Sequence, residues 1–131
     1  MTNQTTPAAL AYLAQRFAKA FEGFVNEVRA AVDAGILDPA LSSTPGLLMW
    51  QTEALPRLEQ ELAAVQDAFM GFQTGETGTL AQLARMQLGL GKNLDGFPLD
   101  FAGPDRAKTL NQLETTVVTA AYQLCTATGT P

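Results

Sequence analysis

The feature that most constrains this chain is an apolar residue at every third or fourth position near its start. Seven large apolar residues share this spacing: Leu10, Leu13, Phe17, Phe21, Phe24, Val28 and Val32. Their mean spacing is about 3.67 residues, close to the 3.6 residues of one α-helical turn. The pattern therefore predicts one long, nearly straight helix with a single apolar stripe.

Residues suited to helix ends set the predicted bounds of this helix at Pro7 and Ala34. Thr6 is a favourable N-cap, and proline suits the first helical position because its missing N–H has no helical partner there. Gly35 is predicted to end the helix, because glycine readily adopts the left-handed conformation of a C-terminal stop.

A second stripe follows a strict 3-4-3-4-3 spacing, which is typical of a coiled-coil seam. Its members are Leu55, Leu58, Leu62, Val65, Phe69 and Phe72. The pair Thr44-Pro45 is predicted to open this helical region, which should end near Gly71. Pro56 interrupts the pattern, so the region either kinks at Pro56 or begins a new helix there.

Two more helices are predicted in the second half of the chain. Thr79 and Gln82 form a capping-box pattern at the start of a short helix. Residues 89–103 hold four glycines and one proline and are predicted to be an irregular loop. The last helix should begin at Pro104 and close at Gly129. Its stripe has a 3-4-3-4 spacing and consists of Leu110, Leu113, Val117, Ala120 and Leu124.

Strand patterns are weak, since the chain has one isoleucine and no long alternation of apolar and polar residues. We therefore predict an all-α fold: residues 1–131 form a single helical domain, a small bundle of three long helices plus one short helix, with an irregular glycine-rich loop before the last helix. The predicted core consists of Leu13, Phe17, Phe21, Phe24, Val28, Leu58, Leu62, Val65, Phe69, Leu110, Leu113 and Val117.

Composition excludes the common kinds of catalytic and metal site. The chain has no histidine and a single cysteine, which excludes a Ser-His-Asp triad, a His-ligated metal and a cysteine-rich zinc site. The Gly89–Asn93 stretch lacks the spacing and flanking strand of a phosphate-binding loop. We predict no catalytic residues, no cofactor and no metal, and therefore a protein that is not an enzyme.

Charge and hydropathy restrict partners and location. The formal net charge is -5 with 8 Lys plus Arg, which argues against nucleic acid as a partner. No apolar run is long enough to cross a membrane, and the first residues lack the basic start of a secretory signal. We expect a soluble protein made in the cytoplasm, with no membrane partner.

The least ordinary surface is the predicted outer face of the last helix, which is rich in threonine and almost free of charge. Thr115, Thr119 and Gln123 represent this face. Because interfaces are depleted in Lys and Glu, we expect it to contact a protein partner. Four apolar loop residues are predicted to contribute to the same contact: Leu94, Phe97, Leu99 and Phe101. The loop packs either on its own bundle or on a neighbour, and both outcomes stay open.

These observations favour a non-enzymatic helical assembly subunit that forms a homo-oligomer or a larger assembly. Small size, low charge and the lack of catalytic residues lead to a narrower hypothesis, a structural component of a virion or other multi-subunit complex, in which the protein is incorporated after its synthesis.

Two alternative functions remain. One is a module that binds a small apolar ligand in a cavity lined by the aromatic residues Phe17, Phe21, Phe24, Phe69 and Phe72. The other is an acidic inhibitor of a basic partner surface, because residues 36–75 carry a net charge of -4. In that region Glu53, Arg57 and Glu61 have the spacing of an exposed ion-pair ladder along one helix face.

Overall fold

All regular structure in the described part of the chain is helical. The computed structural model describes residues 6–129, so the first five and last two residues of the predicted domain 1–131 lie outside the described residues. Within this range there is no strand, which confirms the all-α prediction. The elements are α1 (Pro7–Leu37), α2 (Pro45–Met49), the π-helical turn η1 (Trp50–Ala54), α3 (Leu55–Gln73), α4 (Gly78–Gln87), α5 (Leu90–Asn93) and α6 (Pro104–Thr128).

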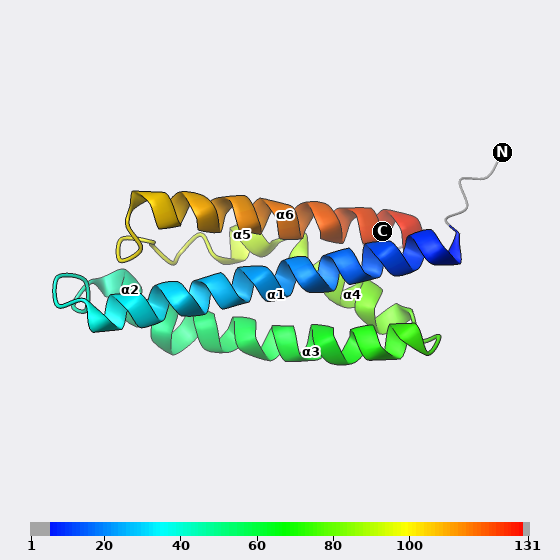
Figure 1. The fold of residues 1–131 in the computed structure, drawn as a ribbon, viewed down its shortest axis with the longest axis horizontal. Coiled ribbons are helices and arrows are strands. Elements are labelled where there is room, and N and C mark those ends of the chain that lie inside the picture. The colour runs from blue at the N-terminus through cyan, green and yellow to red at the C-terminus, as the bar shows by residue number, and fades with distance from the viewer. Residues whose placement is uncertain (1–5, 130–131) are drawn as a thin grey trace.

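The long helices α1, α3 and α6 run lengthwise along the molecule, and α4, α5 and residues 94–103 complete the bundle (Figure 1). Helix α1 packs against α3 and α6, and α4 packs against the same two helices. Helix α3 runs opposite to α1, the chain returns through α4 and α5, and α6 again runs in the direction of α3 (Figure 1). The prediction of three long helices and one short one matches only roughly, because α2 and α5 are additional short helices.

Helix α1 begins as predicted but continues past its predicted end. The Thr6 hydroxyl oxygen accepts a hydrogen bond from the Ala9 backbone N–H at 3.1 Å, which confirms the N-cap. Gly35 does not end the helix, which continues to Leu37. A Cβ atom at Gly35 would lie 3.1 Å from Leu47 and 3.3 Å from Phe101. This glycine therefore allows other segments to pack closely against α1.

A π-helical turn resolves the open question about Pro56. The helical path is continuous from α2 through η1 into α3, and Pro56 lies in the first turn of α3. Proline has no N–H to donate to the carbonyl four residues earlier. Just before it, the backbone N–H of Leu55 bonds to the carbonyl of Trp50, five residues back, as in a π-helix. Helix α3 ends at Gln73, close to the predicted end near Gly71.

Two local predictions in the region after α3 are wrong. Thr79 does not cap α4, which begins at Gly78. Instead, the Glu76 carboxylate accepts hydrogen bonds from the Thr79 hydroxyl and from the backbone N–H groups of Gly78 and Thr79. The Thr79 hydroxyl and the Gly78 N–H lower the pKa of Glu76. Residues 89–103 are also not wholly irregular, because Leu90–Asn93 form the single turn α5.

The last helix follows its prediction closely, from Pro104 to Thr128. Gly129 follows it in the left-handed conformation, with a φ of 73°. This is the C-terminal stop that the sequence predicts.

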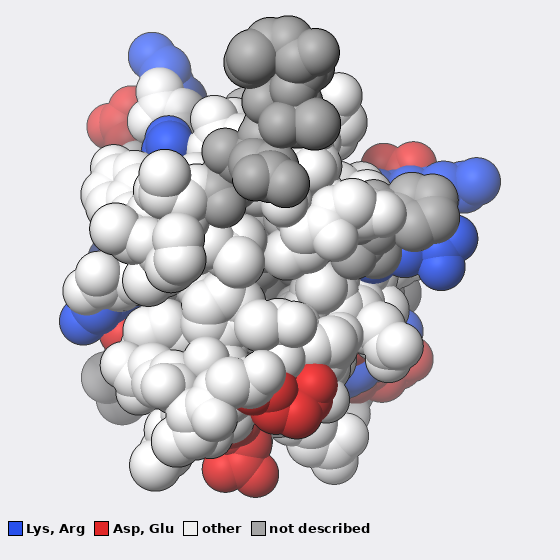
Figure 2. All heavy atoms as spheres, turned by 90° about the vertical axis from the view of Figure 1, so that its right-hand side faces the viewer, with Lys and Arg blue, Asp and Glu red and all other residues white. Residues whose placement is uncertain are grey.

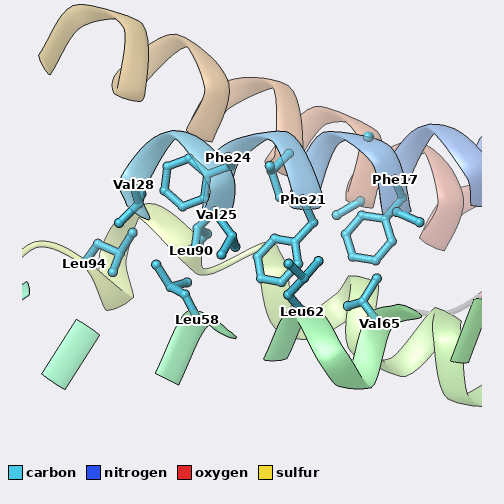
Figure 3. Packing of buried hydrophobic residues seen from close by; sticks show 14 of the residues in the cluster. Phe17, Phe21, Phe24, Val25, Val28, Leu58, Leu62, Val65, Leu90 and Leu94 are labelled. Atoms are coloured by element: carbon cyan, nitrogen blue, oxygen red, sulfur yellow. The ribbon is translucent and has the colours of Figure 1, made fainter. Parts of the chain in front are cut away.

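The core lies between α1 and α3 and is closed by α4, α5 and α6. Phenylalanine and valine side chains of α1 lie against leucine and valine side chains of α3 (Figure 3). Nine of the predicted core residues are buried: Phe17, Phe21, Phe24, Val28, Leu58, Leu62, Val65, Leu110 and Val117. Three predicted core residues are less buried than expected. They are partly buried and pack on the edge of the core: Leu13, Phe69 and Leu113.

Candidate interaction surfaces

The apolar side chains of the segment between α5 and α6 pack on their own bundle. Leu94 and Phe101 are buried, with 7% and 2% of their surface exposed. Phe97 and Leu99 are partly buried against the same core. Of the two outcomes that the sequence leaves open, the described residues therefore adopt the intramolecular one. Only the exposed parts of Phe97 and Leu99 are accessible to a partner.

Trp50 holds this segment in place. Its indole N–H donates a hydrogen bond to the Pro98 carbonyl at 3.0 Å. Its ring makes an edge contact with Phe97, at 5.8 Å between centroids, and a tilted contact with Phe101 at 6.4 Å. These contacts join residues almost fifty positions apart, and no pattern in the sequence indicates them.

A close backbone approach fixes the same segment on α2. A Cβ atom at Gly46 would lie 2.0 Å from the Asp100 side chain and 2.5 Å from the Pro98 carbonyl. Only glycine fits at this position without moving the segment, so the chain from Pro98 to Asp100 is seated directly on the first turn of α2.

The outer face of α6 is exposed, as the prediction of a contact face requires. Thr115 and Thr119 are exposed, and Tyr122 exposes 63% of its surface. Gln123 is half-buried, and its side-chain oxygen accepts a hydrogen bond from the Arg16 guanidinium at 2.9 Å. Gln123 therefore links α6 to α1, and its side-chain oxygen already has a hydrogen-bond partner.

Three threonine hydroxyls of α6 form hydrogen bonds within their own helix. Thr109, Thr115 and Thr116 donate to the carbonyls four residues earlier, at 3.2, 3.1 and 3.0 Å. Because the hydroxyl hydrogens are engaged, these side chains offer methyl groups and oxygen lone pairs rather than donors.

A second exposed surface is a groove between the start of α1 and the end of α3. Its volume is about 750 Å³, and its lining side chains carry no charge: Pro7, Ala8, Leu10, Ala11, Tyr12, Gln15, Phe69, Phe72, Gln73 and Thr77. Figure 2 shows this end of the molecule, where uncharged side chains cover most of the visible surface. Phe17, Phe21 and Phe24 are core residues and do not line the groove, so the predicted five-residue aromatic cavity is only partly present.

The charged residues of the second helical region do not form the predicted ladder. Within residues 6–129, the ion pairs are Arg29–Glu59 at 2.7 Å and Arg106–Glu27 at 3.8 Å. The Arg57 guanidinium lies 5.8 Å from the Phe97 ring centroid. Glu59 thus pairs with α1, Arg57 lies against the segment after α5, and Glu61 accepts a hydrogen bond from Gln87 of α4 at 2.8 Å. The charged side chains of this region therefore contact other segments instead of one another.

Among the described residues, no group of three or more His, Cys, Asp or Glu side chains is placed to hold a metal ion. No described helix is both long and apolar enough to span a membrane. Burial raises the pKa of the Cys125 thiol, whose sulfur lies 3.8 Å from the Ala81 carbonyl oxygen.

Comparison with known proteins gives no relative: no family model, curated protein or solved structure matches the chain.

Proposed function

We propose that the protein is a non-enzymatic assembly subunit that self-associates through the outer face of α6. The observation that carries this proposal is an exposed helix face with almost no charge. After Lys108 the only charged residue of α6 is Glu114, and it is half-buried. Tyr122 stands exposed on the same helix. Interface centres are depleted in charged residues and enriched in tyrosine. A solvated helix face would instead favour charged residues with high helix propensity over threonine.

The hydrogen bonds of the threonine hydroxyls within α6 support close packing of a second helix on this face. Thr115 and Thr116 already bond to their own helix, so burying them leaves no hydroxyl donor without a partner. Short side chains also permit a close approach of two helices. A structural component of a virion or of another multi-subunit complex is the narrower form of this proposal, and it rests on size and composition.

Light scattering at several protein concentrations tests self-association. We expect the wild-type protein to form oligomers, with a mass at least twice the 13.9 kDa of one chain. Thr119→Glu places a charge on the contact face, so we expect it to weaken association at least about tenfold while the CD spectrum stays helical.

Gln60→Glu is the matched control, because Gln60 is exposed on α3 and gains the same charge. It should associate like the wild type. A wild-type mass of 13.9 kDa at every concentration would overturn the proposal, and so would equal weakening by both variants.

The uncharged groove supports a second candidate function, binding of a small neutral apolar molecule. Its volume of about 750 Å³ lies within the range of about 300–1,000 Å³ for small-molecule sites. Phe69 and Phe72 provide aromatic walls, and the absence of charged lining residues favours a neutral ligand.

Titration with N-phenyl-1-naphthylamine, a neutral dye that fluoresces in apolar sites, tests this second function. We expect a saturable rise in fluorescence, which Phe72→Glu should reduce at least about tenfold by placing a charge in the groove. Met86→Glu, at an exposed position outside the groove, should bind like the wild type. Non-saturable fluorescence, or no difference between the variants, would contradict this function.

A further inference from the structure

A small cavity lies where α1, η1 and α6 meet the segment that follows α5. Its volume is about 230 Å³, below the range of about 300–1,000 Å³ for larger ligands. Phe24, Trp50 and Phe97 provide aromatic walls, and aliphatic side chains fill the spaces between them. Such a site suits a small organic molecule with an apolar body.

The polar lining of this cavity is acidic. Its charged residues are Asp95 and Glu114, and Asn111 adds a side-chain amide. Neither carboxylate belongs to the two ion pairs found within the described residues. Burial and the neighbouring charge of Asp95 raise the pKa of Glu114. The chain thus exposes two negative groups to an aromatic cavity and supplies no cation to neutralise them there.

An arginine that contacts the Phe97 ring lines a different cavity. The Arg57 guanidinium lies 5.8 Å from the Phe97 centroid, but Arg57 lines a neighbouring space together with Leu58 and Glu61. The residues that line the cavity with Asp95 and Glu114 therefore include no Lys or Arg, which leaves both carboxylates open to a cation from outside.

We propose that this cavity binds a small organic ammonium ion. Its apolar body would lie against Trp50 and Phe97, and its ammonium group would bond to Glu114 with Asp95 nearby. Aromatic faces attract cations in addition to burying apolar surface, and a carboxylate is a strong acceptor for an ammonium donor. A metal ion fits less well, because the described residues offer no group of three acidic, His or Cys ligands.

The walls of the site are already in place without a ligand. The Trp50 indole is fixed by its hydrogen bond to Pro98 at 3.0 Å. Gly91 leaves room for the Glu114 carboxylate, since a Cβ atom at Gly91 would lie 3.1 Å from its oxygen. A preformed site loses less conformational entropy on binding.

Trp50 is the only tryptophan of the chain, so its fluorescence reports on this cavity. We expect phenethylammonium chloride to change this fluorescence in a saturable manner. Its neutral analogue 2-phenylethanol should bind at least about tenfold more weakly, because it cannot form the charged hydrogen bond.

Variants locate the site and distinguish it from a general effect of net charge. Two single variants, Glu114→Gln and Asp95→Asn, should each weaken phenethylammonium binding by about threefold to tenfold. Asp95 is an exposed position. Asp67→Asn changes the net charge equally at an exposed position on α3 and should leave binding unchanged. Equal binding of phenethylammonium and 2-phenylethanol would overturn the proposal, as would unchanged binding in both cavity variants or the lack of any saturable signal.

Discussion

Replacing Phe21 by alanine should lower the free energy of unfolding by about 3–5 kcal/mol. Phe21 is fully buried, and its ring stacks on Phe17 with 6.3 Å between centroids. Its side chain lies between α1 and α3, close to Leu62 (Figure 3). Truncation removes apolar contacts from both helices and leaves a cavity that the packed core cannot fully close. Denaturant unfolding followed by CD measures the change.

Tyr12→Ala is the matched control for Phe21→Ala. Tyr12 is an aromatic residue of the same helix but exposes 61% of its surface. Its removal should change the free energy of unfolding by no more than about 0.5 kcal/mol. A loss below about 1 kcal/mol for Phe21→Ala would contradict its place in the core.

The helices could be predicted because their residues carry the necessary information locally. The stripe through Phe17, Phe21 and Phe24 needs only helical periodicity to be recognised, and Thr6-Pro7 needs only the chemistry of a helix start. The same rules fail at Gly35, where tertiary packing against Leu47 and Phe101 decides the conformation. A glycine that permits close packing and a glycine that ends a helix look alike in one sequence.

The segment before α6 shows a second limit of sequence reasoning. Its glycines predict irregular structure, but they cannot indicate what its apolar side chains contact. The answer depends on Trp50, which is 48 positions from Pro98. Long-range contacts of this kind have no periodic signature, so the choice between a neighbour and the same bundle stays open until the fold is known.

The candidate surfaces were predictable to different degrees. The neutral face around Thr115 and Thr119 is visible in the sequence because it is a property of one helix. The groove beside Phe69 and Phe72, and the cavity beside Asp95 and Glu114, each combine residues from separate segments. Only the fold brings such residues together, so composition and spacing alone could not locate either site.

Replacing Trp50 by alanine should also lower the free energy of unfolding by about 3–5 kcal/mol. Trp50 exposes only 3% of its surface. Its loss removes the hydrogen bond to Pro98 and the ring contacts with Phe97 and Phe101. Phe21 makes its ring contact within α1, whereas Trp50 makes its ring contacts with the segment before α6. We therefore expect the backbone amides of residues 94–101 to lose protection from hydrogen exchange more than those of α1.

Trp50→Phe separates ring packing from the indole hydrogen bond. It keeps an aromatic ring against Phe97 and Phe101 but cannot donate to the Pro98 carbonyl. Because the ring packing stays and only this hydrogen bond is lost, the expected loss is about 1–2 kcal/mol rather than the full effect. Thermal unfolding and hydrogen exchange of both variants test this assignment. If Trp50→Ala destabilised the chain by less than about 1 kcal/mol, or loosened α1 before residues 94–101, Trp50 would not be the residue that holds this segment on the bundle.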